Sequence, residues 1–311
     1  MARRSAEKAT GKIAVLGAAS PAGARLRAAL ADRGVEGERV TLYGASSEVA
    51  VLSEYDGEAR LVQPVGELDP ASCAAVFVCE AGHDPAPLSR AASAGTVVVD
   101  LSGSVAEAIE VPHPIAGALA AILAPLEASH GLARVSAVVL RPAADFGEPG
   151  MDELREQTVR LLRFEKTPTN VFGRQLAFNV IPDPLLPEEE ADGPARIASD
   201  TRRLLSRPDL PLTVTTALVP IFLGHAVSLH VDVARGTAAD ASEALSGAAG
   251  VTLASREDAG CTMDVVEDEG IVVTAPEDAG AGSMRIWAVV ADAGRTAASR
   301  AVEAADAAGV L

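Results

Sequence analysis

The first third of the chain alternates short, continuous apolar runs with stretches of helical spacing. Apolar runs of this length are typical of strands buried on both faces of a parallel sheet. Helices are expected at Pro21–Arg33, where Leu26 and Leu30 share one face, and at Pro87–Ala94. The strand candidates, of which the third is the weakest, are Lys12–Gly17, Arg39–Tyr43, Leu61–Val65, Ala74–Cys79 and Thr96–Asp100. This alternation predicts an α/β unit with a doubly wound parallel sheet and right-handed crossovers.

The pattern changes after about Gly117, where longer apolar stretches are separated by one or two helices. Helices are expected at Ala118–Ser129, Met151–Leu162 and Ile197–Leu205, with a glycine-containing loop, Ala143–Gly150, before the second. The strand candidates are Ala133–Leu140, Leu212–Val219, Ala226–Val233 and Ile271–Thr274. This order predicts an α+β region with a mostly antiparallel or mixed sheet.

The run at residues 212–224, LTVTTALVPIFLG, is apolar on both faces over much of its length. A sheet with one solvated face does not require so much apolar surface. We therefore expect helices or a second copy of the chain to cover it, and a twofold homodimer is the commonest solution.

The change of pattern divides the chain into two domains, which its length also favours. Residues 1–112 and 291–311 are expected to form the first, because the alanine-rich amphipathic helix at Ala291–Val310 is expected to pack back on it. Residues 113–290 are expected to form the second. The acidic segment Pro187–Gly193 is expected to be a solvated surface loop.

Charge narrows the classes of function. The 311 residues include 43 acidic and 26 basic side chains, a net charge of −17. Such a balance argues against binding to nucleic acid or to an anionic membrane surface, because like charges repel. The longest apolar run, Ile115–Leu126, is too short to span a bilayer, and the basic N-terminus carries no signal-type cleavage pattern. We therefore expect a cytoplasmic protein.

The three cysteines, Cys73, Cys79 and Cys261, are sparse and have no CxxC spacing. An odd number in this arrangement indicates neither a disulfide framework nor a zinc site. No metal site is predicted.

Four segments resemble the aspartate-β-semialdehyde dehydrogenase family, in the family's order and over nearly the whole chain. KIAVLGAASPAG at residues 12–23 is similar to its opening strand and glycine-rich turn, and AFNVIP at 177–182 is the most specific element. Residues 200–233 contain the family's Gly-His turn, and residues 286–298 resemble its closing strand and helix start. The resemblance implies a Rossmann-like sheet followed by an α+β dimerisation and catalytic-type domain with a mixed sheet. It also implies NADP and the reduction of an acyl phosphate through a cysteine thioester.

The residue that would carry the thioester is missing. The resemblance locates the family's catalytic cysteine at one of three positions, His113, Pro114 or Ile115. No cysteine lies between Cys79, which ends a strand candidate, and Cys261, which lies in a loop-like segment. Ser102 and Ser104 show no activating base or oxyanion donors in the sequence.

The resemblance implies that His225, in the Gly-His pair, is the acid–base residue. Leu223 and Val227 stand where the family has an arginine and an acidic residue, so His225 is expected to have lost its polar setting. Asn179 and Arg196 are the remaining candidates for substrate binding, and Arg196 keeps a cation at a family lysine position.

Three of the family's anion-binding positions carry no positive charge in this chain. Ala106 and Leu218 stand where the family has arginines, and Glu148 stands where it has a lysine. The family's catalytic-domain glutamine falls at Arg141 or Pro142. These replacements would repel an acyl phosphate.

The glycine-rich turn keeps some of the family's cofactor-binding features and lacks others. Gly17 and Gly23 keep the turn and the close helix–strand packing, while Ser20 and Pro21 form a good N-cap and first helical residue, so the helix still directs N–H groups at an anion. The second strand is followed by no acid for a ribose diol. The cofactor-binding candidates are Gly17, Ser20, Pro21, Ala22, Gly23, Ser46 and Ser47. We expect no tightly bound cofactor, and NADP binding that is weak where it persists.

These losses predict a catalytically degenerate, homodimeric family member that acts as a binding or interaction scaffold for a ligand or protein partner that the sequence does not name. The alternative is an NADP-dependent oxidoreductase that uses His225 as acid–base. A third, weaker hypothesis is an acyl-phosphate reductase with an unrecognised nucleophile.

Overall fold

The computed structural model describes residues 11–44, 52–186, 193–255, 260–265, 270–291 and 293–311. The chain forms two compact units, Met1–Pro112 with Gly294–Leu311, and His113–Ala293. The sequence located the second boundary three residues earlier, at 290/291. Ser46, Ser47 and most of the acidic Pro187–Gly193 segment lie outside the described residues.

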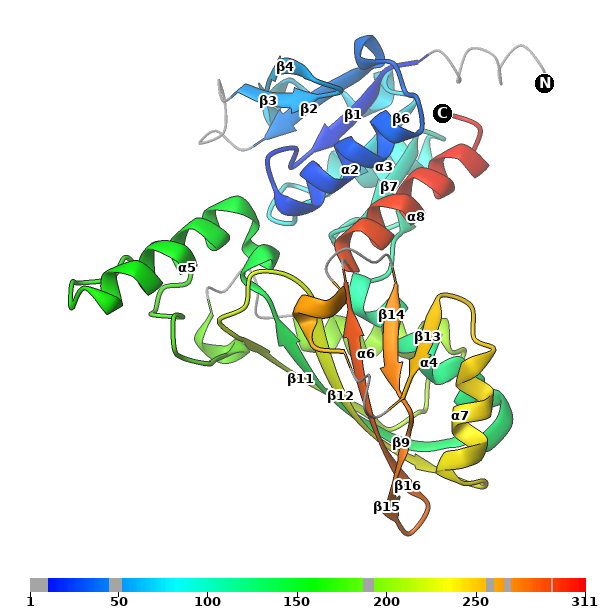
Figure 1. The fold of residues 1–311 in the computed structure, drawn as a ribbon. Coiled ribbons are helices and arrows are strands. Elements are labelled where there is room, and N and C mark those ends of the chain that lie inside the picture. The colour runs from blue at the N-terminus through cyan, green and yellow to red at the C-terminus, as the bar shows by residue number, and fades with distance from the viewer. Residues whose placement is uncertain (1–10, 45–51, 187–192, 256–259, 266–269, 292) are drawn as a thin grey trace. The chain divides into compact units, whose positions relative to one another are not determined.

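The first unit contains a six-stranded sheet in the order β5-β2-β1-β6-β7-β8, in which every neighbouring pair is parallel. Its strands are β1 Ile13–Leu16, β2 Val40–Gly44, β5 Gln63–Pro64, β6 Ala75–Val78, β7 Val97–Asp100 and β8 Ile109–Glu110. Its helices are α2 Pro21–Asp32, α3 Ala86–Ser93 and α8 Ala293–Ala307 (Figure 1). This order confirms the predicted doubly wound parallel sheet.

One strand prediction in this unit is wrong. The segment Leu61–Val65 does not form a single strand: β3 Leu52–Tyr55 and β4 Glu58–Leu61 form an antiparallel hairpin, and only Gln63–Pro64 joins the parallel sheet. Pro64 has no N–H to continue the ladder, and the chain turns into a short 3₁₀ helix directly after it.

The two faces of the parallel sheet carry separate apolar cores. On one face, Leu30 of α2 and Ala301 of α8 belong to the cluster that contains Val15. On the other face, Leu88 of α3 packs in a cluster with Val76. Strands covered on both faces explain why the sequence shows continuous apolar runs without alternation.

The second unit contains a mixed sheet of eight strands in the order β10-β11-β9-β12-β16-β14-β13, with β15 paired to β16. The pairs β9/β11 and β13/β14 are parallel and the others are antiparallel. The strands are β9 Leu132–Arg141, β10 Ile181–Pro182, β11 Leu212–Leu218, β12 His225–Val233, β13 Val251–Ala254, β14 Ile271–Thr274, β15 Glu277–Gly280 and β16 Ser283–Val290. The helices are α4 Pro114–His130, α5 Gly147–Leu162, α6 Gly193–Leu204 and α7 Ala238–Ser246. The predicted mixed sheet is confirmed.

One face of this sheet is covered and the other is exposed. Side chains of α4, α6 and α7 share one core with the inward positions of β9, β12 and β16. Along β11, Leu212 and Leu218 are buried, whereas Thr213 and Thr215 are exposed. The expectation that this strand is apolar on both faces is therefore wrong, because threonines take the outward positions.

Three helices of the second unit, α4, α5 and α6, begin four residues earlier than predicted. α4 begins at Pro114, because His113 caps its N-terminus and proline is well tolerated in the first turn. α5 begins at Gly147, inside the segment expected to be a loop. Within the described ranges, no helix is both long and apolar enough to cross a membrane.

Candidate functional site

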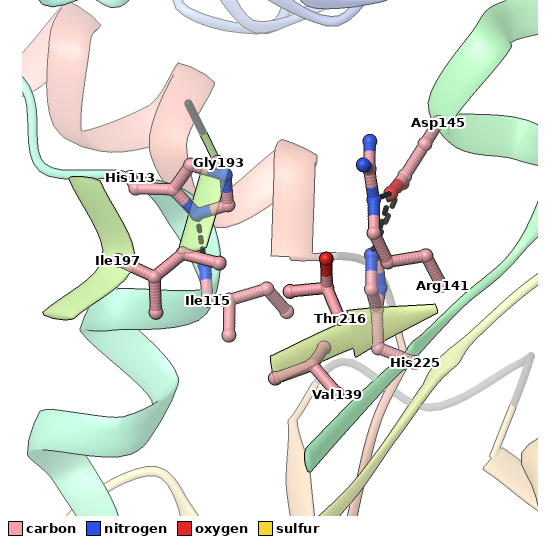
Figure 2. Close-up of a pocket in the computed structure, with 9 residues that line it drawn as sticks. All are labelled: His113, Ile115, Val139, Arg141, Asp145, Gly193, Ile197, Thr216 and His225. Atoms are coloured by element: carbon pink, nitrogen blue, oxygen red, sulfur yellow. Dashed lines mark hydrogen bonds and ion pairs between the residues drawn. The ribbon is translucent and has the colours of Figure 1, made fainter. Parts of the chain in front are cut away.

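A small cavity of about 30 Å³ lies in the second unit (Figure 2). Its residues come from the start of α4, the ends of β9, β11 and β12, the turn after β9 and the start of α6. They are His113, Ile115, Val139, Arg141, Asp145, Gly193, Ile197, Thr216 and His225. A cavity of this size accommodates about one or two water molecules. A larger ligand would require the walls to move.

A buried charge network forms one wall of this cavity. The carboxylate of Asp145 receives a hydrogen bond from Arg141 Nε at 2.8 Å and lies 3.0 Å from His225 Nε2 (Figure 2). Arg141 Nη1 also lies 3.6 Å from the buried carboxylate of Asp183. Burial by itself raises the pKa of Asp145, but the charges of His225 and Arg141, and hydrogen bonds from both, outweigh burial and hold that pKa well below its usual range. Asp145 is therefore an anion that orients His225.

Local backbone geometry explains how His225 reaches this position. Gly224 has a φ of +78°, which favours glycine, and a Cβ there would lie 3.2 Å from Thr262 Cβ. The turn makes His225 the first residue of β12, where it pairs with β16 at Val290. The Gly-His pair is thus a strand entry that directs the imidazole into the cavity.

His113 and Ile115 form the opposite wall, at the N-terminus of α4 (Figure 2). His113 Nδ1 accepts a hydrogen bond from Ile115 N at 3.2 Å, and His113 N donates to Asp200 Oδ2 at 2.7 Å. Burial, followed by the charge of Arg196, lowers the pKa of His113 to about 3. His113 is therefore neutral near pH 7, and because its Nδ1 accepts a bond, the proton is assigned to Nε2.

Two polar atoms on the cavity wall have no hydrogen-bond partner in the described part of the chain. They are Thr216 Oγ1 and His225 Nδ1, and both residues are buried. An imidazole with a carboxylate at one nitrogen and an unoccupied second nitrogen is suited to proton transfer. The lining residues include no thiol, so the wall offers acid–base groups but no sulfur nucleophile.

The structure corrects the expected surroundings of His225. Leu223 and Val227 flank it as expected, but the prediction that it had lost its polar setting is wrong. Asp145 supplies that setting from 80 residues away in the sequence. No local signal could have identified Asp145, Thr216 or Asp183 as partners, although Asp183 directly follows the specific FNVIP run.

The two substrate-binding candidates lie in different surroundings. Arg196 Nε lies 3.7 Å from Asp200 Oδ2, in the group of charges around His113. Asn179 is exposed and does not line the cavity. Its side chain donates to Gln175 O at 2.9 Å and accepts from Val180 N at 2.8 Å, which is a turn-stabilising role.

The cofactor candidates lie at the carboxyl end of β1 in the first unit. Gly17 has a φ of +74°, and a Cβ on Gly23 would lie 2.2 Å from Gly17 O, so the turn and the helix approach closely at these glycines. Ser20 caps α2 by accepting a hydrogen bond from Gly23 N at 3.1 Å, with Pro21 and Ala22 as the next two residues. Ser46 and Ser47 lie outside the described residues.

Cys79 and Ser102 are not arranged as nucleophiles. Cys79 is buried, and burial, Asp100 and Glu80 raise the pKa of its thiol. Ser102 Oγ donates to Asp100 at 2.6 Å, and its second contact is Ser104 Oγ, also at 2.6 Å. In the described part of the chain, no group of three His, Cys, Asp or Glu residues could hold a metal ion.

Comparison with known proteins places this geometry in context. Residues 123–289 match the family described as semialdehyde dehydrogenase, dimerisation domain. The chain is 26% identical to a USG-1 protein homolog of Azotobacter vinelandii over 275 residues, which cover 79% of this chain and 81% of that protein.

Solved structures share the fold. The aspartate semialdehyde dehydrogenase II of Vibrio cholerae superposes with a TM-score of 0.81 at 22% identity, over 96% of this chain and 98% of that one. The aspartate semialdehyde dehydrogenase of Candida albicans, solved with NADP, superposes with a TM-score of 0.68 at 13% identity, over 97% of this chain and 100% of that one. At these identities the superpositions establish the architecture of the chain.

Proposed function

Because the chain belongs to the semialdehyde dehydrogenase family, we propose that it is a member that no longer performs the thioester reaction and acts as a binding or interaction protein. The observation that carries the proposal is the wall formed by His113 and Ile115 at the N-terminus of α4. This is where the family resemblance locates the cysteine, and the chain has a neutral imidazole and an isoleucine there. A helix N-terminus lowers the pKa of a thiol placed on it, but here it has no thiol to activate.

The decisive experiment measures phosphate-dependent NADP reduction with aspartate semialdehyde. We expect no turnover, because loss of the nucleophile removes the covalent step and residual sites retain only about 10³–10⁴-fold catalysis over water. A turnover number near 1 s⁻¹ or above, which is within the ordinary range of enzymes, would contradict the proposal. His113→Cys and Ile115→Cys variants complete the test, since reaction of each thiol with iodoacetamide reports whether the helix N-terminus still activates it.

The pairing of Asp145 with His225 favours a second candidate function. A histidine oriented by a buried carboxylate is the arrangement of a general acid–base residue. The alternative is therefore an oxidoreductase in which His225 handles the proton without a thiol. NADPH-dependent reduction of small aldehydes that disappears in a His225→Gln variant would support this alternative over the scaffold.

We further propose that the chain forms a homodimer through the exposed face of its mixed sheet. The matched family is described as a dimerisation domain. Val138 on β9 is 43% exposed and pairs with the exposed Thr215 of β11, and Trp287 on β16 is 36% exposed. Large apolar side chains at outward sheet positions are suited to contact with a second copy.

NADP is the cofactor that the fold implies, and we propose that the chain binds it weakly at most. A thermal-shift survey with NADPH, NADH and phosphorylated amino acids tests this. A ligand at 100 times its dissociation constant stabilises the folded state by roughly 2.7 kcal/mol, which such a survey detects. A saturable shift at micromolar NADPH would favour the oxidoreductase.

A further inference from the structure

The carboxylate of Glu80 lies against the glycine turn of the first unit. Glu80 follows β6, the strand paired with β1, and Gly17 follows β1. The Cβ of Glu80 lies 2.6 Å, and its Oε2 3.2 Å, from the point where a Cβ on Gly17 would be. The space beside this turn is thus occupied by an acidic side chain of the same chain.

The backbone donors of the turn are largely engaged. The N–H groups of Gly17 and Ala18 donate to Tyr43 O at 3.0 and 3.1 Å. Ser20 N donates to Gly17 O, Gly23 N donates to Ser20 Oγ, and Pro21 has no N–H. Phosphate binding at a strand–turn–helix depends on N–H groups that point at the anion without another partner. This turn uses most of them to stabilise itself.

The electrostatic surroundings are also unfavourable to a second anion. Asp100 is the last residue of β7, which pairs with β6. It is fully buried, and its carboxylate accepts hydrogen bonds from backbone N–H groups of residues 102, 103 and 105. Burial raises the pKa of Cys79, and Asp100 and Glu80 add to that rise, each by more than Arg27 lowers it. Arg27 is the cation at the turn, where its Nε donates to Ala18 O at 3.2 Å. The diphosphate of a nicotinamide dinucleotide therefore does not fit the turn, on grounds of both donors and charge.

We propose that Glu80 is the residue that excludes dinucleotide phosphates from this turn. Its carboxylate occupies the place beside Gly17 and repels a phosphate that approaches the N-terminus of α2. The inference rests on the proposed function and deepens it, because it names the residue that keeps NADP binding weak. Removing this charge removes the repulsion and leaves the hydrogen bonds of the turn as they are, so NADPH should bind more tightly.

The test compares NADPH binding by the full chain with that of the Glu80→Gln variant, by isothermal titration calorimetry. Removing one negative charge next to the phosphates is expected to lower the dissociation constant at least about tenfold, the equivalent of 1.4 kcal/mol. Glu38→Gln is the matched control, because Glu38 is exposed and precedes β2, at the amino edge of the sheet. This control removes the same charge far from the turn and should leave binding unchanged.

Adenosine serves as an uncharged probe, and its binding should respond to neither substitution. Thermal unfolding checks that each variant is folded. If the glutamine of Glu80→Gln disturbs folding, Glu80→Ala is the second variant that removes the same charge. Tighter NADPH binding by Glu80→Gln alone supports the proposal. Equal binding by Glu80→Gln and the unmodified chain, an equal gain by Glu38→Gln, or micromolar binding by the unmodified chain would overturn it.

The outcome is separable from that of the proposed function. The binding comparison measures NADPH affinity without turnover, whereas the aspartate semialdehyde assay measures turnover by the unmodified chain. A Glu80→Gln variant that fails to gain affinity overturns the role of Glu80 and leaves the loss of thioester chemistry standing. Turnover by the unmodified chain overturns the proposed function directly.

Discussion

The glycine turn of the first unit and the cavity of the second differ in the groups that they offer to a ligand. The turn has the glycines Gly17 and Gly23, but most of its N–H donors are engaged and a carboxylate lies beside it. The cavity has no thiol but keeps a buried network of Asp145, Arg141 and His225.

This difference has a physical basis. Glycines at a close helix–strand approach are required by the fold itself, so they can remain when a ligand is no longer bound. Charges in a buried network depend on one another, because removing one leaves the others buried and uncompensated. Retained residues in either place therefore report on stability as well as on chemistry.

The largest expected effect concerns the exposed sheet face of the second unit. The double substitution Thr213→Glu with Thr215→Glu should convert the proposed dimer to monomers, since like charges facing each other at an interface cost several kcal/mol. Light scattering at micromolar concentration measures the mass. Ala24→Glu with Ala28→Glu, on the exposed surface of α2, adds the same charge to the first unit and should leave the dimer intact. A monomeric mass for the unmodified chain would refute the dimer.

The next effect tests the buried network. Asp145→Asn leaves Arg141 and His225 with a neutral partner, and should lower the free energy of unfolding by about 3 kcal/mol. Urea denaturation measures it. The matched control is Asp152→Asn on α5. Asp152 forms an ion pair with Arg155, and the two side chains are 58% and 65% exposed. That exposed pair should contribute less than about 1 kcal/mol. Equal losses in both variants would mean that the cavity wall is not an interdependent network.

A third prediction concerns pH. The folded chain holds the pKa of His113 at about 3, below the 6.5 of an unfolded chain. The unfolded state therefore binds a proton first as pH falls, so the stability contributed by neutral His113 is complete above pH 6.5 and declines toward pH 3.

The variant that tests this is His113→Asn, because an asparagine side chain keeps an acceptor for Ile115 N and does not titrate. Between pH 6.5 and 5 the unmodified chain should lose about 2 kcal/mol more unfolding free energy than this variant. Denaturant titrations at several pH values measure the difference. Parallel pH profiles for the two proteins would show that His113 does not titrate with folding.

The smallest effect concerns the turn. Ser20→Ala removes the cap of α2, and should cost about 1 kcal/mol of unfolding free energy. Because the Ser20 hydroxyl is engaged with Gly17 O and Gly23 N, the same variant should not change NADPH binding. Thermal unfolding and calorimetry check the two statements. A loss of affinity without a loss of stability would assign Ser20 to a ligand and weaken the contrast between the two regions.

The local pattern of apolar and polar residues predicted most of the architecture. Continuous apolar runs marked β1, β2, β6 and β7, because strands covered on both faces need apolar side chains at every position. Short edge elements such as β8, and the hairpin of β3 and β4, carry too few apolar residues to give a signal. The start of α4 was missed because histidine is an unusual N-cap and the residues that follow it include two uncommon helix formers, Pro114 and Gly117.

The sequence by itself determined the family, the order of the two units, the absence of a cysteine between Cys79 and Cys261, and the residues of the glycine turn. These are properties of residue identity and of periodicity over a few turns or strands. The tertiary structure decided that Asp145 orients His225, that His113 is a neutral cap on the cavity wall, and that Glu80 lies against Gly17. Each of these depends on strands and helices meeting from distant parts of the chain, and burial then sets the charge that each side chain carries.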